Sequence, residues 1–344
     1  MKALVLAAGE GVRLRPLTNV LPKALVPVLN VPLAEYGLFA LEEAGCGEIV
    51  MNAFHLAGRV GDFIRNRRGK AALELVIEEV LLGTGGAIRN VAGEFQGGTF
   101  LVANADVLHG IDLAQALKVH HEKKALATLL LRSSGWESYG GFLVGEDGRL
   151  RGYLPKGERP PPGLRAGMFT GLHVLEPEIL GHLPSEKIFC VVQKLYRPLI
   201  EKASPLFAHF VDEAPWEDLG TPARYLEANL SLLENLEVDS LLPASARKIL
   251  SERGIAQRRP GILAPAPFSP SGGVRLQGPS LFGKNVQLSV GAGAGPGCIV
   301  GEGSLLEAGA QIERCVIWSG ASVPPGEWKG RVFYGPGESV EAVS

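Results

Sequence analysis

The sequence lacks the features that mark several common classes of protein. Its 344 residues include only four cysteines, and no two of them form a C-x-x-C pair, so neither a zinc ribbon nor a thioredoxin-type site is predicted. Four cysteines are also too few for a disulfide scaffold, which fits a reducing cytoplasm. The apolar stretch at residues 3–8 is too short for a secretory signal, and no run of 18 apolar residues occurs. We therefore expect a cytoplasmic protein without a membrane span.

The sequence also lacks a surplus of either charge. There are 34 Lys and Arg residues against 36 Asp and Glu, which gives a formal net charge of −2. Nucleic acids and anionic membranes are bound through a basic surplus, so we expect neither as a partner. Hydrophobic residues make up 46% and charged residues 20% of the chain, as in proteins that bury a large core. The length predicts two or three domains.

Glycine and proline, in contrast, are abundant, with 45 and 24 residues. They dominate after residue 260, where apolar residues recur at every sixth position. A period of six predicts one flat strand per repeat and three repeats per triangular coil of a parallel β-helix. A flexible glycine-rich tail has no reason to keep an apolar phase for so long, so we favour the β-helix. The positions in phase are Leu276, Phe282, Leu288, Ala294, Val300, Leu306, Ile312 and Trp318.

From residue 1 to about residue 125, short apolar runs alternate with helical patterns. Such alternation is typical of a Rossmann-like α/β fold, in which helices cover both faces of a mostly parallel sheet. Residues 125–218 are rich in strand patterns and include a predicted hairpin, and a helix is expected at 221–237. In the N-terminal part, the predicted strands are 4–8, 48–52, 73–77 and 99–104, and the predicted helices are 32–44, 56–68, 85–92 and 112–122.

The first motif that carries chemistry is LAAGEGVRLRPLT with PKALVPV shortly after it, at residues 6–28. Gly9 and Gly11 lie where a strand gives way to a loop, so backbone N–H groups can bind phosphate oxygens. Arg13 and Lys23 add two cations that can hold a polyphosphate. Glycines alone would fit a plain strand-to-helix turn, and the loop matches neither a Rossmann fingerprint nor a P-loop. The glycines and cations together predict a phosphate-binding loop.

Two aspartates are candidate metal ligands. Asp106 follows an apolar strand in LVANADVL, at the carboxyl edge where ligands of parallel sheets bind. Asp218 precedes a Gly-Thr-Pro helix start in PWEDLGTP. Two carboxylates near phosphates are typical of a Mg²⁺ site. For either aspartate alone, a helix cap or a turn would be the usual explanation.

The order of these motifs resembles the sugar-1-phosphate nucleotidyltransferases, or NDP-sugar pyrophosphorylases, whose opening signature reads close to LAAGxGTRLRPLT…PKxLxPV. The similarity runs from Met1 to about Leu233 and resumes in the hexapeptide repeats. It implies Mg²⁺-dependent transfer of a nucleotidyl group from an NTP to a hexose 1-phosphate, with pyrophosphate as the second product. It also implies a catalytic domain at 1–240, a linker segment at 241–265 and a left-handed parallel β-helix at 266–344.

The resemblance assigns roles to individual residues. Arg13, Lys23, Asp106 and Asp218 would be catalytic, with the two aspartates holding Mg²⁺ and the two cations neutralising the triphosphate. The nucleotide-binding residues would be Ala7, Ala8, Gly9, Gly11, Arg13, Gly83, Thr84 and Asn104. The residues on the sugar-phosphate side would be Gly141, Lys156, Thr170, Gly171 and Trp216.

Two positions depart from the family pattern. Val12 stands where the family has Thr, which removes a hydroxyl from the phosphate loop, and Pro155 stands where the family has Glu, beside the retained Lys156. A catalytically silent sugar-nucleotide sensor or regulatory subunit is therefore an alternative function, against which the four intact catalytic residues argue. An acyltransferase is a weaker alternative, because the β-helix offers no catalytic histidine.

The motif GTGGAI bears on the choice of substrates. It resembles the GTAGAI of family members that use guanine, and together with the β-helix it favours GTP and mannose 1-phosphate. Glucose 1-phosphate with UTP or dTTP stays open, because one sequence does not show the hydrogen bonds that select the base. We expect the β-helix to act as an oligomerisation or regulatory element, and the protein to be a homo-oligomer.

Two further patterns look functional but have simpler explanations. GPSLFGKN at 278–285 nearly matches a Walker A loop, but Asn285 replaces the final Ser or Thr and the segment lies in phase with the hexapeptide repeat. His120, His121 and Glu122 invite a metal site, yet adjacent residues at a helix end face different ways, so we expect a solvated helix face.

Overall fold

The computed structural model describes residues 1–238, 240–270 and 272–342, and the chain forms two compact units. The first unit consists of residues 1–10 and 37–216, and the second of residues 11–36 together with the chain from residue 217 onward. The chain therefore changes unit inside the predicted phosphate loop, between Glu10 and Gly11, and again just before Asp218. The predicted domain boundaries at residues 240 and 265 divide the chain in linear order and stay a prediction.

Nine strands form the sheet of the first unit: β1 (Lys2–Leu6), β4 (Glu48–Ala53), β5 (Ala72–Ile77), β6 (Phe100–Asn104), β8 (Ala127–Arg132), β9 (Gly141–Val144), β10 (Leu150–Leu154), β11 (Arg165–Leu175) and β12 (Leu206–Phe210). The main path runs β10-β9-β11-β6-β1-β4-β5, and β8 pairs with both β11 and β12. β1 is parallel to β4 and β6, and β4 to β5, as the sequence predicts. β11 runs antiparallel to β6, β8 and β9, so the sheet is mixed beyond β6.

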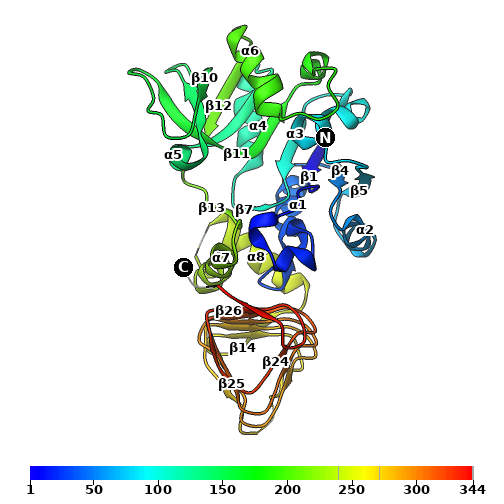
Figure 1. Cartoon of the computed structure of the whole chain (residues 1–344), viewed down its shortest axis with the longest axis vertical. Coiled ribbons are helices and arrows are strands. Elements are labelled where there is room, and N and C mark those ends of the chain that lie inside the picture. The colour runs from blue at the N-terminus through cyan, green and yellow to red at the C-terminus, as the bar shows by residue number, and fades with distance from the viewer. Residues whose placement is uncertain (239, 271, 343–344) are drawn as a thin grey trace. The chain divides into compact units, whose positions relative to one another are not determined.

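The helices of this unit are α2 (Ala57–Asn66), α3 (Gly83–Asn90), α4 (Leu113–Lys123), α5 (Trp136–Tyr139) and α6 (Arg197–Glu201), and α1 (Leu33–Glu43) enters it from the second unit. α2 packs against β5 and α3 against β1 (Figure 1). α4 packs against β8 and β12. α4 begins where Asp112 caps it, because the Asp112 carboxylate accepts a hydrogen bond from the Gln115 N–H at 3.0 Å. The α/β fold predicted for residues 1–125 is confirmed.

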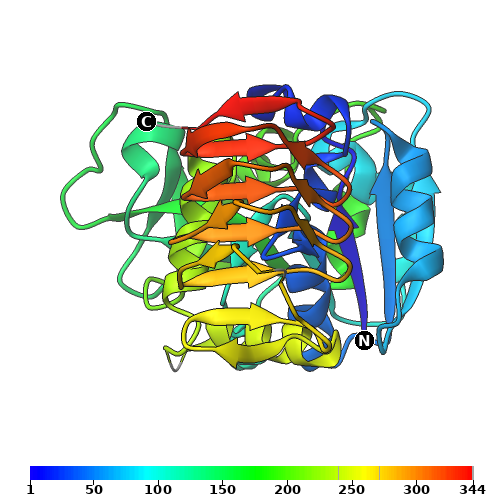
Figure 2. The same ribbon diagram turned by 90° about the horizontal axis from the view of Figure 1, so that it is seen from below.

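The second unit contains a three-sided parallel β-helix, as predicted (Figure 1). Its stacked coils appear as successive layers in Figure 2. Face 1 consists of β15 (Ile262–Ala264), β17 (Ser280–Phe282), β20 (Cys298–Val300), β23 (Cys315–Ile317) and β26 (Arg331–Phe333), with β14 (Ala256–Arg259) and β27 (Ser339–Glu341) at its ends. Face 2 consists of β16 (Arg275–Leu276), β19 (Gly293–Ala294), β22 (Ala310–Glu313) and β25 (Gly326–Lys329). Face 3 consists of β18 (Gln287–Leu288), β21 (Leu305–Leu306) and β24 (Ser322–Val323).

The coils of the β-helix become shorter toward its C-terminal end. Phe282 pairs with Val300, Val300 with Ile317 and Ile317 with Phe333, so the spacing falls from 18 residues to 17 and then 16. The predicted positions from Phe282 to Ile312 do lie in the core of the helix, with Leu276 packed against it. The prediction for Trp318 is wrong. Ile317 occupies the inward position instead, because losing one residue from a coil moves the next side chain to the opposite face.

The second unit also contains two α-helices and a short hairpin. The hairpin joins β2 (Pro27–Val28) to β3 (Val31–Pro32), and the helices are α7 (Pro222–Glu234) and α8 (Leu241–Glu252), of which α8 was not predicted. α7 contacts β23, β26 and β27. The outward side chains of face 1 are at most 1% exposed, because this face is covered; they are Leu281, Ile299, Val316 and Val332. Across the described ranges, no helix is long and apolar enough to cross a membrane.

Candidate active site

The predicted phosphate loop turns at Gly11, in the second unit. Gly11 has φ of +61°, in the left-handed region that favours glycine, and its carbonyl accepts a hydrogen bond from Thr18 Oγ1 at 2.9 Å. A Cβ at this position would lie 2.8 Å from Thr18 Cγ2 and 3.1 Å from Lys23 Cβ. Only glycine therefore permits the close packing of this turn against Thr18 and Lys23.

Asp218 binds both cations of the signature. Its Oδ1 lies 2.8 Å from Lys23 Nζ and its Oδ2 lies 3.0 Å from Arg13 Nη2. The side chains of Lys23 and Asp218 are 6% and 10% exposed, whereas that of Arg13 is 63% exposed. Gly220 lies directly beneath the guanidinium, since a Cβ there would be 2.9 Å from Arg13 Nη1. The sequence predicted the three charged residues but not that they bind to one another.

The charges of this cluster keep Asp218 ionised. Burial alone would raise the pKa of the Asp218 carboxyl, because water solvates the charged form best. The hydrogen bonds and positive charges of Lys23 and Arg13 outweigh that effect and hold its pKa below the usual value. The cluster thus presents, at neutral pH, a carboxylate, a buried ammonium and an exposed guanidinium within one small volume.

In the first unit, the residues that follow β1 are held by a buried polar chain. The Ala7 N–H donates to Asn52 Oδ1 at 2.7 Å, and Asn52 Nδ2 donates to Glu78 Oε1 at 2.6 Å. The other oxygen of Glu78 accepts a hydrogen bond from the Leu82 N–H at 3.0 Å, just before α3. Sequence reasoning missed Asn52 and Glu78. Asn52 lies near the carboxyl end of its apolar strand, directly opposite Leu6 in the parallel register. A polar residue at that place is the signal that could have identified Asn52.

Several predicted residues meet at the carboxyl end of β6. Asn104 pairs with Leu6 of β1, and Gly171 lies against it, since a Cβ on Gly171 would be 2.5 Å from Asn104 Nδ2. Trp216 Nε1 donates to the backbone oxygen of Thr170 at 3.1 Å. Asp106 is the next residue after Ala105, and the Ala105 N–H donates to Leu6 O at 2.9 Å. The predicted nucleotide and sugar-phosphate residues of this region therefore share one edge of the sheet.

The start of α3 is already occupied by protein groups. The N–H groups of Gly85 and Gly86 donate to Phe189 O at 3.0 and 3.3 Å, and the Val191 N–H donates to Thr84 Oγ1 at 3.1 Å. Gly83 has φ of +72° and a Cβ there would lie 2.8 Å from Phe189 O. The glycines of this motif therefore have a packing role, and the nucleotide contacts of Gly83 and Thr84 stay a prediction.

Gly141 and Lys156 belong to the predicted hairpin, which the structure contains as β9 and β10. Gly141 is the first residue of β9, and a Cβ there would lie 2.6 Å from Gly167 O of β11, so close strand packing explains this glycine. Lys156 is exposed in the turn that follows β10. The roles of both residues toward a sugar phosphate stay a prediction.

Comparison with known proteins identifies the family. Residues 2–235 match the family model described as nucleotidyl transferase. The chain belongs to this family. It is 30% identical to the mannose-1-phosphate guanylyltransferase of Mycobacterium tuberculosis, over 91% of this chain and 83% of that protein. It is 27% identical to the UTP–glucose-1-phosphate uridylyltransferase of Synechocystis, over 95% of this chain and 85% of that protein.

Solved structures agree on the fold of this nucleotidyl transferase. HddC from Yersinia pseudotuberculosis, solved in complex with GMP-PN, superposes with a TM-score of 0.56 at 21% identity, covering 67% of this chain and 98% of that one. A UDP-glucose pyrophosphorylase complexed with UDP-glucose superposes with a TM-score of 0.58 at 22% identity, covering 68% and 98%. At these identities the likeness shows the fold alone.

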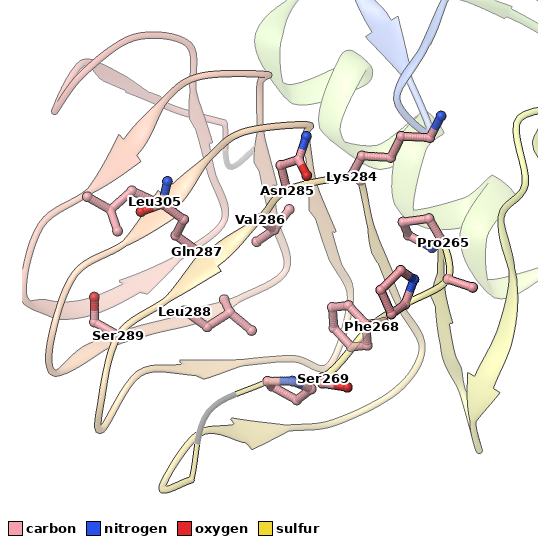
Figure 3. Close-up of a pocket in the computed structure, with 14 residues that line it drawn as sticks. Pro265, Phe268, Ser269, Lys284, Asn285, Val286, Gln287, Leu288, Ser289 and Leu305 are labelled. Carbon is pink, nitrogen blue, oxygen red and sulfur yellow. The ribbon is translucent and has the colours of Figure 1, made fainter.

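The Walker-like stretch of this nucleotidyl transferase lies in the β-helix. Lys284 and Asn285 line a cavity of about 560 Å³ together with Phe268 and Leu288, and the Lys284 side chain extends away from Phe268 (Figure 3). No helix begins there, because β18 follows at once. The segment is part of a coil, as its phase predicts.

His120 of α4 has a structural role. His120 is fully buried, with Nδ1 2.9 Å from Thr128 Oγ1 and Nε2 2.9 Å from Glu176 Oε1, so the expectation of a solvated face is wrong for it. Burial lowers the pKa of His120, and Glu176 opposes that shift. Within the described part of the chain, no group of three or more His, Cys, Asp or Glu residues is arranged to hold a metal ion.

Proposed function

We propose that this nucleotidyl transferase joins a nucleoside triphosphate to a hexose 1-phosphate, forming an NDP-sugar and releasing pyrophosphate. The observation that carries the proposal is the cluster of Arg13, Lys23 and Asp218, in which two cations meet one ionised carboxylate. Two phosphate-bearing substrates repel each other, and fixed positive charge offsets that repulsion. The names of the relatives support a sugar phosphate as one substrate.

The side chains have a limited task in such a reaction. An oxygen of the sugar phosphate is already a nucleophile, so no residue has to remove a proton from it. The protein has to hold the attacking oxygen, the α-phosphorus and the leaving pyrophosphate in line. Arg13 can exchange Asp218 for phosphate oxygens, because most of its side chain is exposed. Lys23 is buried and keeps its place against Asp218.

We propose Asp106 and Asp218 as the ligands of a Mg²⁺ ion. The donor set fits, since Mg²⁺ prefers carboxylate oxygens together with substrate phosphates and water. Asp218 is ionised at neutral pH, and a carboxylate oxygen that accepts one hydrogen bond from Lys23 or Arg13 keeps a second lone pair. When bound, the ion would offset negative charge on the phosphates.

We propose GTP and mannose 1-phosphate as the substrates. The guanylyltransferase names of the relatives from Mycobacterium tuberculosis and Arabidopsis thaliana support this choice, as does the resemblance of GTGGAI to guanine-using members. The Synechocystis relative favours glucose 1-phosphate and UTP as a second candidate pair. The intact cluster around Asp218 argues against a silent regulatory subunit.

Pyrophosphate release tests the proposal directly. The protein is incubated with Mg²⁺ and each pairing of GTP, UTP, dTTP and ATP with mannose 1-phosphate or glucose 1-phosphate. We expect the largest kcat/KM for GTP with mannose 1-phosphate. Higher kcat/KM for UTP with glucose 1-phosphate would select the second candidate, and no release with any pairing would reject the activity.

Substitution of Asp106 tests the metal assignment. We expect Asp106→Asn to abolish turnover while the far-UV circular dichroism and Tm stay unchanged, because the amide replaces a charged ligand at equal size. Asp112→Asn is the matched control, since Asp112 caps α4 and asparagine caps equally well, so turnover should persist. Near wild-type, Mg²⁺-dependent activity in Asp106→Asn would reject the assignment.

We also propose that the protein forms a homo-oligomer through its β-helix, because flat coil faces favour symmetric packing. Light scattering after size exclusion should give a mass that is a multiple of the chain mass. The mass of one chain at micromolar concentration would contradict this.

A further inference from the structure

The hairpin of β2 and β3 has a turn that its surroundings must hold in place. The turn consists of Leu29 and Asn30, with φ of +48° and +60°, as a two-residue hairpin turn of this kind requires. Asparagine tolerates this left-handed conformation, but leucine rarely adopts it. Leu29 is fully buried, so contacts around it have to compensate for its backbone conformation.

Side chains of α7 supply part of that support. Asn229, which is fully buried, accepts a hydrogen bond from the Leu29 N–H at 2.9 Å. The Tyr225 hydroxyl donates to Pro27 O, at the start of the hairpin. The Tyr36 hydroxyl, from the helix that follows the hairpin, donates to Val28 O at 3.0 Å. The backbone of the hairpin is thus fixed mainly by α7.

The β-helix supplies the rest. Trp318 Nε1 donates to the Tyr225 hydroxyl oxygen at 2.9 Å, so one tyrosine links the β-helix to the hairpin. Asn30 Nδ2 donates to Val300 O of β20 at 2.9 Å. Trp318 is only 4% exposed, and it faces outward because the coil between Val300 and Ile317, just before it, is one residue shorter than the preceding coil.

The two segments held in this way lead directly to the charged cluster. Lys23 lies in a short turn that ends two residues before β2. Asp218 lies three residues before Thr221, the N-cap of α7. Lys23 Nζ lies 2.8 Å from Asp218 Oδ1. Each segment is tied to Tyr225 close by: the first through the hydrogen bond to Pro27 O, and the second because Tyr225 follows in α7.

We propose that Trp318 is a positioning residue for the transfer reaction, acting through Tyr225 and the hairpin on the Lys23–Asp218 pair. This inference rests on the proposed function, because it assigns the pair a role in turnover. The indole N–H fixes the hydroxyl of Tyr225, the hydroxyl fixes the carbonyl of Pro27, and the hairpin fixes the approach of Lys23 to Asp218. The role needs the short coil, which turns Trp318 out of the β-helix core.

The test compares two tryptophans of the same β-helix. Trp318→Phe keeps an aromatic ring and removes the hydrogen bond to Tyr225. Trp328→Phe is the matched control, because Trp328 Nε1 donates to Pro324 O at 3.0 Å on face 2 and is not part of the relay. We expect Trp318→Phe to lower kcat about three- to tenfold, the value of one hydrogen bond, with KM for the sugar phosphate unchanged. Trp328→Phe should lower Tm by about as much as Trp318→Phe does, and it should leave kcat unchanged.

A double-mutant cycle with Tyr225→Phe tests the relay itself. If Trp318 acts through Tyr225, the double variant has the kcat of Tyr225→Phe alone, because the second substitution removes nothing further. Additive losses would show that Trp318 acts by another route and would overturn the proposal. So would a Trp318→Phe variant whose kcat equals that of the control.

Hydrogen–deuterium exchange separates this inference from the proposed function. Two amides report on the hairpin: that of Leu29, and that of Leu33, which donates to Val26 O at 3.0 Å. Both should exchange faster in Trp318→Phe than in wild type, and their exchange should be unchanged in Trp328→Phe. If the wild type turns over no substrate pair, the proposed function fails while faster exchange still supports the link to the hairpin. Unchanged exchange at both amides would reject the link.

Discussion

Glu78 of the first unit and Asp218 of the second are both carboxylates with little exposure, 5% and 8%, and each binds two donors. The donors of Glu78 are neutral, namely the Asn52 amide and the Leu82 N–H. Those of Asp218 are Lys23 and Arg13. The first carboxylate joins backbone and side-chain groups around the sheet, and the second gathers the two positive charges of the LAAGEGVRLRPLT and PKALVPV motifs.

A cationic partner is not what distinguishes the two. Glu42 and Arg67 also form an ion pair, at 2.7 Å, but their side chains are 5% and 3% exposed and no part of the pair reaches solvent freely. In the Asp218 cluster, Arg13 is 63% exposed. A charged side chain that is fixed by a buried partner and is also exposed to solvent can bind a ligand without a rearrangement of the cluster. This combination distinguishes the Asp218 cluster, which could bind a ligand, from the Glu42–Arg67 pair, which is buried at both ends.

Substituting Asp218 should have the largest effect. Asp218→Asn would remove the carboxylate that pairs with the buried Lys23, which costs about 3 kcal/mol of stability, and would disperse the cluster, which costs about a thousandfold in kcat. Urea denaturation and steady-state kinetics measure the two effects. A variant that keeps more than a tenth of the wild-type kcat would remove the distinction between Asp218 and Glu78.

Removing Lys23 should reduce the stability that the Asp218 carboxylate contributes above about pH 4. In the wild type the lowered pKa of Asp218 adds stability above about pH 4, the usual range of the carboxyl, and that contribution is lost as pH falls through the lower folded-state pKa. In Lys23→Met the hydrogen bond and charge of Lys23 are lost, so the pKa of Asp218 lies higher than in the wild type. We expect the variant to be about 2 kcal/mol less stable at pH 7, with the gap closing below pH 4. Urea midpoints at pH 7, 5 and 3.5 measure this, and a gap that does not depend on pH contradicts it.

Glu78→Gln should have the smallest effect on activity. The glutamine amide offers one acceptor oxygen to two donors, so either Asn52 or Leu82 loses its partner, at about 1–3 kcal/mol of stability. We expect kcat to change less than about threefold, because no charge of the site is involved. Glu79→Gln, at the exposed neighbouring position, is the control and should change neither quantity. A loss of activity equal to that of Asp218→Asn would mean that both carboxylates serve the reaction.

The parts of the fold that follow from local pattern were predictable. Strands and helices up to α4 alternate with clear periodicity, and the structure contains them within a few residues of their predicted positions. The antiparallel placement of β11 was not predictable, because strand direction is set by pairing with distant strands. The predicted inward position of Trp318 is wrong for a related reason. A count of six cannot reveal where a coil is one residue shorter.

The same limit applies to the site. The sequence marks Arg13, Lys23 and Asp218 through motif and residue type, yet the ion pairs join residues 195 and 205 positions apart. Such pairs depend on how α7 and the hairpin pack, which no local pattern records. Tyr225 and Asn229 look like ordinary positions of an amphipathic helix. Their hydroxyl and amide have partners that only the fold reveals.

The way the chain alternates between its compact units limits how the protein can be shortened or recombined. Residues 11–36 share their unit with the chain from residue 217 onward, so the C-terminal repeats are not an interchangeable module. A truncation after residue 240 would remove β23, β26 and β27 from α7, the Val300 carbonyl from Asn30 of the hairpin, and Trp318 from Tyr225. A chimera that exchanges the repeats for those of a relative would have to carry residues 11–36 with them.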